Sequence, residues 1–355
     1  MNLRMRQPAE LALLLGTGLL GALVAQAVGL PIPFLLGSLV ATAALALTLA
    51  ARTGKAMGFP VRLRAIFIGM IGAMIGTTFT PDVVSLAPAL PITLSAMVAF
   101  VLMALGANYA IFRHLGGYDR PTATYAAMPG GLIESVEIGE RAGADTVTLS
   151  IQHFVRIVLV IVTVPLLFLA VTGEAVGSAA GQTLETSATG WLDWALVVVL
   201  ALAGGILGKR LRLPAAALIG PLILTAGMQA TGVIDVEGPQ LLLNAAQLVV
   251  GASLGARFST TTPRRLLLAL GLGAVSTAVT LGIASLMSLA LAPLVPISFQ
   301  TLLISFSPGG VTEMSLIALS IGASPVLVSV HHLFRILFAV AVAGLTARFD
   351  TPSGD

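Results

Sequence analysis

The sequence predicts an all-α integral membrane protein with two inverted repeats, each of about five transmembrane helices plus one re-entrant or broken helix. Three observations lead to this fold class. Of the 355 residues, 57% are hydrophobic and 9% are charged, whereas soluble domains carry about 25% charged residues. Apolar runs near the roughly 20 residues that cross a bilayer as a helix recur along the chain, without the alternating polarity of barrel strands. The second half also repeats the first, and its basic residues indicate the opposite orientation.

Five apolar spans and one interrupted segment make up the first half, which we expect to form the first membrane repeat over residues 1–171. Arg4 and Arg6 precede the first span as they would in a secretory signal. The apolar run is long for a signal peptide and has a later counterpart, so we interpret it as a helix of the mature protein. The expected spans are 11–29, 33–50, 65–80, 88–112 and 147–171, with the interrupted segment near 121–143.

A polar stretch of small residues at 172–190 divides the chain near its middle and has the composition of a flexible connecting loop. The second half, 191–355, is expected to form the second, inverted membrane repeat. Its spans are 191–208, 214–231, 240–257, 266–292 and 325–347, with the second interrupted segment near 298–322.

The two halves share polar residues in register. When residues 128–159 are placed on 307–338, an offset of 179 without gaps, twelve of 32 positions are identical. Apolar identities are common among membrane sequences, but shared ionisable positions are not. The same offset pairs GAMIGTTFT with GASLGARFS, and an offset of 183 pairs the segments that begin at Leu30 and Leu213. The duplication therefore covers nearly the whole chain.

The basic residues predict the orientation through the positive-inside rule. With a cytoplasmic N-terminus, and with each interrupted segment entering and leaving on one side, 16 of the 18 Lys and Arg residues face the cytoplasm. The other two, Arg156 and Arg335, lie within spans. Five crossings per half then invert the second half, as in many secondary transporters. Six full crossings per half would instead place Lys209, Arg210 and Arg212 outside. A broken crossing helix, balanced by a boundary error elsewhere, stays open as an alternative.

Each interrupted segment contains a Pro-Gly-Gly motif. Proline removes a backbone donor and each glycine costs about 1 kcal/mol in a helix interior, so the helix should break there. Irregular backbone at membrane depth is tolerated only against protein or a water-filled cavity. In the inverted arrangement the two loops meet near the midplane, and the helices that follow direct their positive N-terminal ends at one substrate site. A surface turn is the alternative for each motif. The motif residues are Pro129, Gly130, Gly131, Pro308, Gly309 and Gly310.

Glu134 and Glu313 lie in the first turn after each break. An acid at this place complements the helix dipole, which is a structural role. Ionisable groups within a membrane, however, by default mark a substrate or ion path. Cation coordination or proton transport is therefore the functional alternative, and it motivates an expected coupling to protons or sodium. The neighbouring hydroxyl residues Ser135 and Thr312 complete this part of the substrate-binding set.

Arg156 and Arg335 lie about 14 to 15 Å into their spans, near the midplane of the bilayer. A central arginine costs about 2.5 to 3.5 kcal/mol on insertion scales, so each should face protein, with Glu134 or Glu313 as the available partner. Two interpretations follow. The arginines form structural Arg–Glu pairs, or a guanidinium group and two helix N-termini together bind a carboxylate or other anion.

His153 and His332 precede these arginines by three residues, on the same helix face. They are candidates for a proton relay because histidine titrates near neutral pH. Hydrogen bonding across helices is the alternative. Asp145, at the start of its span, is expected to be a helix cap.

Other residues carry packing signals. Small residues four positions apart let two helices approach closely, and buried amides can bond between helices. The glycines are Gly72, Gly76, Gly251 and Gly255, and the amides are Asn108, Asn244 and Gln247.

Two segments reading MPGGLIES and SPGGVTEMSL, each followed by a span with His-x-x-Arg, resemble the AbrB-duplication membrane family. Members of this family are often labelled as ammonia monooxygenases or AbrB-family regulators. The resemblance covers essentially the whole chain, and PGG-x-x-E at 129–134 and 308–313 is its most specific part. The second copy has Met314 for Ser135 and Leu316 for Glu137, which argues against a strictly symmetric site. More distantly, inverted five-helix repeats resemble secondary transporters of the bile-acid, citrate and sodium–proton exchange type.

These features favour a transporter over an enzyme. A copper or iron oxygenase needs clustered ligands, and the chain has no cysteine and four histidines with one adjacent pair. No segment is long enough for a soluble, basic DNA-binding domain. We expect alternating access in the cell inner membrane, with both termini cytoplasmic and a homodimer as the assembly. The expected partners are a small-molecule substrate, a coupling ion and the lipid bilayer, with no cofactor, metal or nucleic acid. A channel, and a membrane-embedded oxygenase or regulator, are the alternatives.

Overall fold

The computed structural model describes residues 6–79, 85–172, 190–213, 215–236, 238–260 and 263–350. In this part of the chain the regular secondary structure is helical, with no strand. Eight of the described helices are long and apolar enough to cross a membrane. The expected fold class, an all-α multi-pass membrane protein, is therefore confirmed. Almost all of the expected connecting loop at 172–190 lies outside the described residues.

The helices of the first half follow the expected spans and the expected interruption. A 3-10 turn at Ala87–Ala89 leads directly into helix α5, and α5 is followed directly by a π-helical turn at Ile111–Leu115. The helices are α1 (Arg6–Ala27), α2 (Pro33–Thr53), α3 (Val61–Thr77), α5 (Leu90–Ala110), α6 (Arg120–Ala126), α7 (Leu132–Arg141) and α8 (Thr146–Thr172).

The helices of the second half repeat this order. A 3-10 turn at Arg257–Thr260 extends the third of them. They are α9 (Trp191–Arg210), α10 (Ala216–Ala230), α11 (Gln240–Ala256), α12 (Pro263–Leu291), α13 (Phe299–Phe306), α14 (Val311–Ser320) and α15 (Pro325–Asp350).

Helix boundaries repeat at the offset found in the sequence. The bounds of α11 are those of α3 shifted by 179 residues. The same shift relates the bounds of α7 to those of α14, and the first residue of α8 to the first residue of α15. Helix α3 begins at Val61, four residues before the expected span. Its first turn includes Arg62 and Arg64, which precede the apolar run that predicts the span.

The described chain divides into two compact units, and each unit draws on both halves. Unit 1 comprises α1, α2, α3, α9, α10 and α11 together with residues 164–172 and 315–326. Unit 2 comprises α5, α6, α7, α12, α13, most of α8 and α15 and the start of α14. The halves of the sequence and the compact units are therefore different divisions of the chain.

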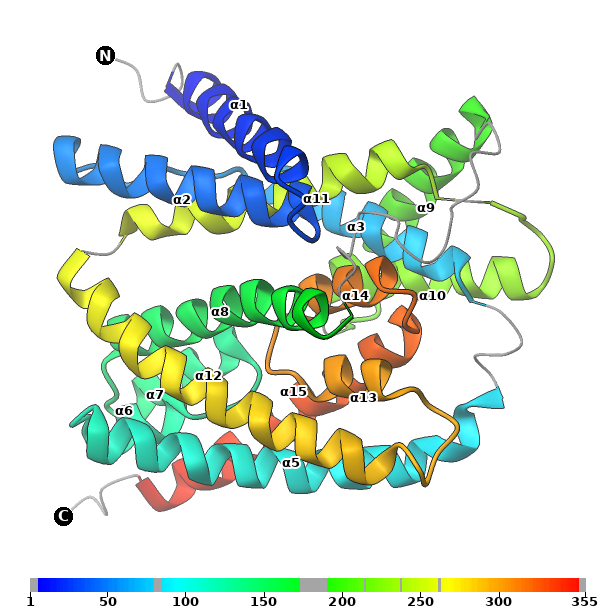
Figure 1. Ribbon diagram of the computed structural model, residues 1–355. Coiled ribbons are helices and arrows are strands. Elements are labelled where there is room, and N and C mark those ends of the chain that lie inside the picture. Colours follow the sequence, from blue (N-terminus) through cyan, green and yellow to red (C-terminus); the bar gives the residue numbers. More distant parts are fainter. Residues whose placement is uncertain are drawn as a thin grey trace. The chain divides into compact units, whose positions relative to one another are not determined.

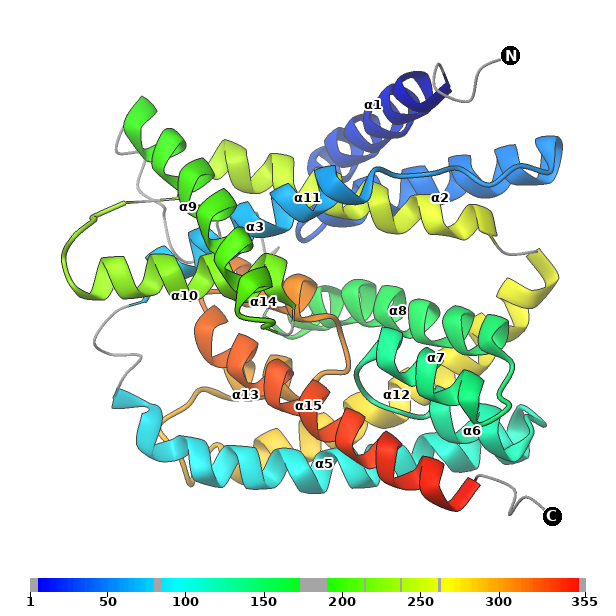
Figure 2. The ribbon, with the colours of Figure 1, turned by 180° about the vertical axis from the view of Figure 1, so that it is seen from behind.

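In unit 1, helices from opposite halves pack through glycine. Figure 1 and Figure 2 show α3 beside α10 and α2 beside α11. A Cβ atom at Gly76 of α3 would lie 2.6 Å from Thr225 Cβ and 2.8 Å from Leu222 O of α10. A Cβ at Gly255 of α11 would lie 2.7 Å from Leu39 O of α2. The expected role of these glycines in close helix contact is confirmed.

Two further helix pairs of unit 1 share one kind of glycine contact. In the pair α1 and α2, a Cβ at Gly21 would meet the backbone of Gly37. In the pair α9 and α10, a Cβ at Gly204 would lie 2.9 Å from the carbonyl carbon of Gly220. These two pairs are related by the sequence offset of 183. The duplicated sequence therefore produces the same local packing twice.

In unit 2, a buried amide joins α5 to α12. Ser276 donates a hydrogen bond to Asn108 Oδ1 at 2.7 Å, and Asn108 Nδ2 donates to Thr280 Oγ1 at 3.1 Å. The expected interhelical role of Asn108 is confirmed. In unit 1, Asn244 instead accepts a bond from Gln240 of its own helix, and the Gln247 amide makes no hydrogen bond among the described residues.

Asp145 caps α8, as expected. Its Oδ1 accepts hydrogen bonds from the backbone N–H groups of Val147 at 3.0 Å and Thr148 at 3.3 Å. The Thr148 hydroxyl bonds to Oδ2 at 2.6 Å, and this bond holds the pKa of the Asp145 carboxyl below its usual value. The cap fixes the start of the helix that carries His153 and Arg156.

Candidate functional site

The Pro-Gly-Gly motifs break the helix in both halves. Helix α6 ends at Ala126 and α7 starts at Leu132, while α13 ends at Phe306 and α14 starts at Val311. Gly131 has φ 64°, a left-handed conformation that glycine adopts without the steric cost of a side chain. We call residues 127–131 the first loop and residues 307–310 the second loop. Both loops belong to unit 2.

The two arginines hold these loops by equivalent hydrogen bonds. Arg156 of α8 donates from Nη1 to Met128 O at 2.7 Å, and Arg335 of α15 donates from Nη1 to Ser307 O. Met128 and Ser307 each precede the proline of a motif, and the arginines follow them by 28 residues. Arg335 donates a second bond, from Nη2 to Gly309 O, at 2.6 Å. Each arginine thus ties its long helix to the loop of its own half.

The first half uses different donors at this place, because Nη2 of Arg156 bonds to His153 Nδ1 at 3.0 Å instead of to a loop carbonyl. Gly130 O, the counterpart of Gly309 O, accepts a hydrogen bond from the Ser135 hydroxyl at 3.2 Å. The second half has Met314 in place of Ser135, and a Cβ at Gly309 would lie 2.6 Å from its side chain. Methionine has no hydroxyl to donate, and in the second half the donor to this carbonyl is Arg335 Nη2. The asymmetry expected from Met314 is therefore present in the site.

His153 is held in one protonation state. Its Nε2 bonds to Tyr125 O at 2.9 Å, and its Nδ1 bonds to Arg156 Nη2 at 3.0 Å. A carbonyl only accepts and a guanidinium only donates, so this bonding assigns the proton to Nε2 and leaves Nδ1 as the acceptor. His153 is neutral in this arrangement. A proton relay through it would require the Arg156 bond to break.

His332 has a different bonding pattern from its counterpart. Its Nδ1 bonds to Val328 O of its own helix at 3.0 Å, which leaves Nε2 buried without a hydrogen bond in the described structure. No hydrogen bond links His332 to Arg335 in the described structure, so the histidine–arginine bond of the first half is not repeated in the second.

The first loop also contacts the arginine helix of the second half. A Cβ at Gly130 would lie 3.5 Å from Ile336 Cα and 3.6 Å from Arg335 Nε of α15. Arg335 therefore lies against the first loop while its guanidinium group bonds to the second. Arg156 and Arg335 are also close enough to interact electrostatically, as like charges. The structure brings together two loops and two arginines that are far apart in the sequence.

The glutamates bend back towards their own helix ends. Glu134 Oε2 would lie 3.2 Å from a Cβ at Gly131, and the Glu313 carboxylate contacts the corresponding position at Gly310. Both glycines directly precede the helix that carries the glutamate. This is the geometry of an acid that complements a helix N-terminus. The alternative expectation, an Arg–Glu pair, is wrong: the described hydrogen bonds of Arg156 and Arg335 go to loop carbonyls and to His153.

The arginine pair forms a buried positive centre. Arg156 is 5% exposed and Arg335 is 1% exposed. The Nε atom of each is buried without a hydrogen-bond partner in the described part of the chain. Pro129, Pro308 and Ser135 are buried around it, and Thr312 is half-buried. Two N–H donors and two positive charges are thus available, which is the chemistry that binds a small anion.

The comparisons with known proteins assign the family. The profile of the family described as "Transition state regulatory protein AbrB" matches residues 43–350. The chain belongs to the AbrB family. A protein of Escherichia coli (strain K12) named "Putative regulator AbrB" is 26% identical over 344 residues, covering 96% of this chain and 94% of that protein. "Uncharacterized protein YhjN" of Bacillus subtilis (strain 168) is 23% identical over 340 residues, covering 91% and 88%. No solved structure matches the chain at a significant level.

Sequence reasoning missed several contacts of this AbrB-family site. His331 bonds to Leu327 O at 2.8 Å and to the Thr93 hydroxyl at 2.9 Å, and so joins α15 to α5. The one feature of the sequence that could have drawn attention to His331 was its position next to His332. The carbonyls of Met128 and Ser307 had no signal, because every residue carries a carbonyl and the sequence does not show which ones a side chain will reach.

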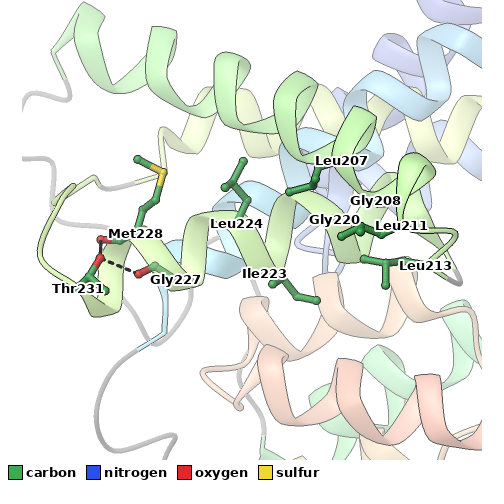
Figure 3. A pocket seen from close by; sticks show the side chains of 10 residues that line it. All are labelled: Leu207, Gly208, Leu211, Leu213, Gly220, Ile223, Leu224, Gly227, Met228 and Thr231. Carbon is green, nitrogen blue, oxygen red and sulfur yellow. Dashed lines mark hydrogen bonds between the residues drawn. The ribbon is translucent and has the colours of Figure 1, made fainter.

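Unit 1 of this AbrB-family protein has grooves of a different kind. One groove lies between α9 and α10, and Figure 3 shows its lining of apolar side chains with a single hydroxyl, that of Thr231. That hydroxyl bonds to Gly227 O at 2.9 Å within its own helix. The groove therefore offers no charged group for a substrate, and the candidate site is the arginine centre of unit 2.

Proposed function

We propose that this AbrB-family protein is a secondary-active transporter of a small carboxylate or other small anion. Transport is coupled to protons or sodium and proceeds by alternating access. The protein lies in the cell inner membrane as a homodimer with both termini in the cytoplasm, and the interrupted segments are re-entrant. The substrate binds at the two loops and at Arg156 and Arg335.

The observation that carries the proposal is the pair of buried arginines that bond to carbonyls rather than to carboxylates. Moving a charge from water into a low-dielectric interior costs several kcal/mol even after relaxation. Carbonyl dipoles offset part of this cost but leave the net charge in place, and the two like charges repel each other. A bound anion offsets both the cost of burying the charges and the repulsion between the two arginines. A purely structural site would be expected to use a permanent carboxylate partner instead.

The division into two units supports alternating access. Each unit contains equivalent helices from both halves, and alternating access needs two bundles that can move against each other. The loops and both arginines belong to a single unit, so the substrate would stay with that bundle as the access changes. The positive-inside pattern supports the inverted orientation and the cytoplasmic termini.

The test is anion binding and uptake with the purified protein. We expect a screen of small carboxylates and inorganic anions to find ligands that raise the temperature of unfolding, because binding to the folded state stabilises it. Arg335→Lys keeps the charge but loses the paired donors to Ser307 O and Gly309 O. It should weaken anion binding by about 10- to 100-fold and slow uptake into liposomes. Arg52→Lys, at the exposed end of α2, is the matched control and should behave like the parent.

Two outcomes would contradict the proposal. Flux far above the turnover of a carrier would indicate a channel, and stoichiometric metal in the purified protein would support an oxygenase.

Coupling to protons or sodium has a separate test. If the variant Glu134→Gln/Glu313→Gln kept the parent's dependence on both ion gradients, the glutamates would have no role in coupling, and the helix-capping interpretation would be sufficient.

A further inference from the structure

A second groove of unit 1 lies on the other side of α9 and combines an apolar wall with two cations. It is formed by α3, α9 and α10, and small residues widen it, since a Cβ at Gly205 would meet nothing within 4 Å. The lining residues on α9 run from Ala201 to Lys209, which corresponds to about 12 Å along the helix. The apolar side chains Ile66, Leu202 and Ile206 line it and are exposed.

Arg62 and Lys209 lie at one end of this groove. Arg62 is in the first turn of α3 and Lys209 is in the last turn of α9, and both side chains are exposed. Neither forms an ion pair among the described residues. The three helices carry one acidic residue, Asp193. It lies at the opposite end of α9, about 24 Å along the helix from Lys209. Lys209 complements the negative end of α9, but Arg62 lies at the positive end of α3, where a cation is unfavourable.

We propose that this groove binds one anionic phospholipid. The phosphate group lies between Arg62 and Lys209, and an acyl chain lies along Ile66, Leu202 and Ile206. Helix ends are where lipid headgroups lie, and the positive-inside pattern places this end at the cytoplasmic leaflet, which carries the negative surface charge. A free phosphate would use the cations alone and would gain nothing from the apolar wall. The proposal does not depend on the proposed transport function.

The test compares two lipids with the same acyl chains on the purified full-length protein. Native mass spectrometry measures how many phosphatidylglycerol and phosphatidylcholine molecules remain bound. Each basic residue near the lipid surface contributes roughly a five-fold preference for anionic lipid. We therefore expect about a 25-fold preference in the parent and little preference in Arg62→Gln/Lys209→Gln. The exposed Arg52→Gln serves as a control for a general loss of charge and should keep the preference.

The apolar wall of the groove is tested by a matched pair of variants. Gly205→Leu would fill the proposed groove, while Gly227→Leu would fill the uncharged groove of Figure 3, and a Cβ at either position meets nothing within 4 Å. Gly205→Leu should lose the bound phosphatidylglycerol, and Gly227→Leu should retain it. Equal retention of the two lipids by the parent, or an unchanged preference in the double Gln variant, would overturn the proposal. So would inorganic phosphate that displaces the lipid completely, because it would show a site for a free anion.

Discussion

At the scale of single residues, two neighbouring glycines of the first loop should respond differently to the same substitution. Gly131 has φ 64°, and a Cβ there would lie 3.1 Å from Val340 Cγ2. An alanine in the left-handed region costs about 1 to 2 kcal/mol. Gly131→Ala should therefore lower the free energy of unfolding by at least this amount, measured as a lower midpoint of denaturant unfolding.

Gly130→Ala should leave stability nearly unchanged but weaken anion binding. The added methyl group meets Ile336 Cα at 3.5 Å and Arg335 Nε at 3.6 Å, which are ordinary contacts. It would, however, cover the side of Arg335 that carries the unpaired N–H. A lost hydrogen bond to a charged group corresponds to roughly a 10-fold weaker dissociation constant. If Gly130→Ala binds the screened anions as the parent does, the Nε–H of Arg335 is not part of the site.

The residue scale also shows what the sequence could predict of the candidate site. The shared register of Arg156 with Arg335, and of the two Pro-Gly-Gly motifs, was sufficient to place these residues together. The expected pairing with Glu134 or Glu313 failed because charge matching in a sequence ignores the backbone. Once the glycines break the helix, nearby carbonyls lose their helical partners and become the closest acceptors for the guanidinium groups.

At the scale of helices, glycine determines which pairs can approach closely. A Cβ at Gly21 of α1 would meet Gly37 O and Ala41 Cβ of α2, whereas a Cβ at Gly16 of the same helix meets nothing within 4 Å. Gly21→Ala should destabilise the protein by about 1 to 3 kcal/mol, because the two backbones must separate. Gly16→Ala should be neutral or slightly stabilising, since alanine is the better helix former. Thermal unfolding of both variants in one detergent provides the measurement, and equal midpoints would refute the tight α1–α2 contact.

The helices were largely predictable because their length and apolarity are set by the bilayer. The expected spans match α2, α5, α9 and α12 within a few residues at most ends. The partners of each helix were not predictable in the same way. Glycine spacing marks a helix face that can be approached closely, but it does not name the helix that approaches. The pairing of α3 with α10 and of α2 with α11 across the two halves therefore appeared only in the structure.

At the scale of the whole molecule, the duplication and the charge pattern make separate contributions. The duplication is visible in repeated helix bounds and repeated glycine contacts. The inversion depends on the positive-inside rule alone. It requires that equivalent positions of the two halves lie on opposite sides of the membrane, and this requirement has a direct test.

Leu115 and Leu294 provide the matched pair for that test. They are related by the offset of 179, each follows a long helix, and they are 69% and 67% exposed. The chain contains no cysteine, so single Leu115→Cys and Leu294→Cys variants need no background substitutions. An impermeant thiol reagent applied to intact cells should label the cysteine at 294, and the cysteine at 115 should react only after the membrane is opened. Labelling of both from the same side would mean that the halves have one orientation. The two loops could not then approach the arginine centre from opposite sides of the membrane, and alternating access would need a different structural basis.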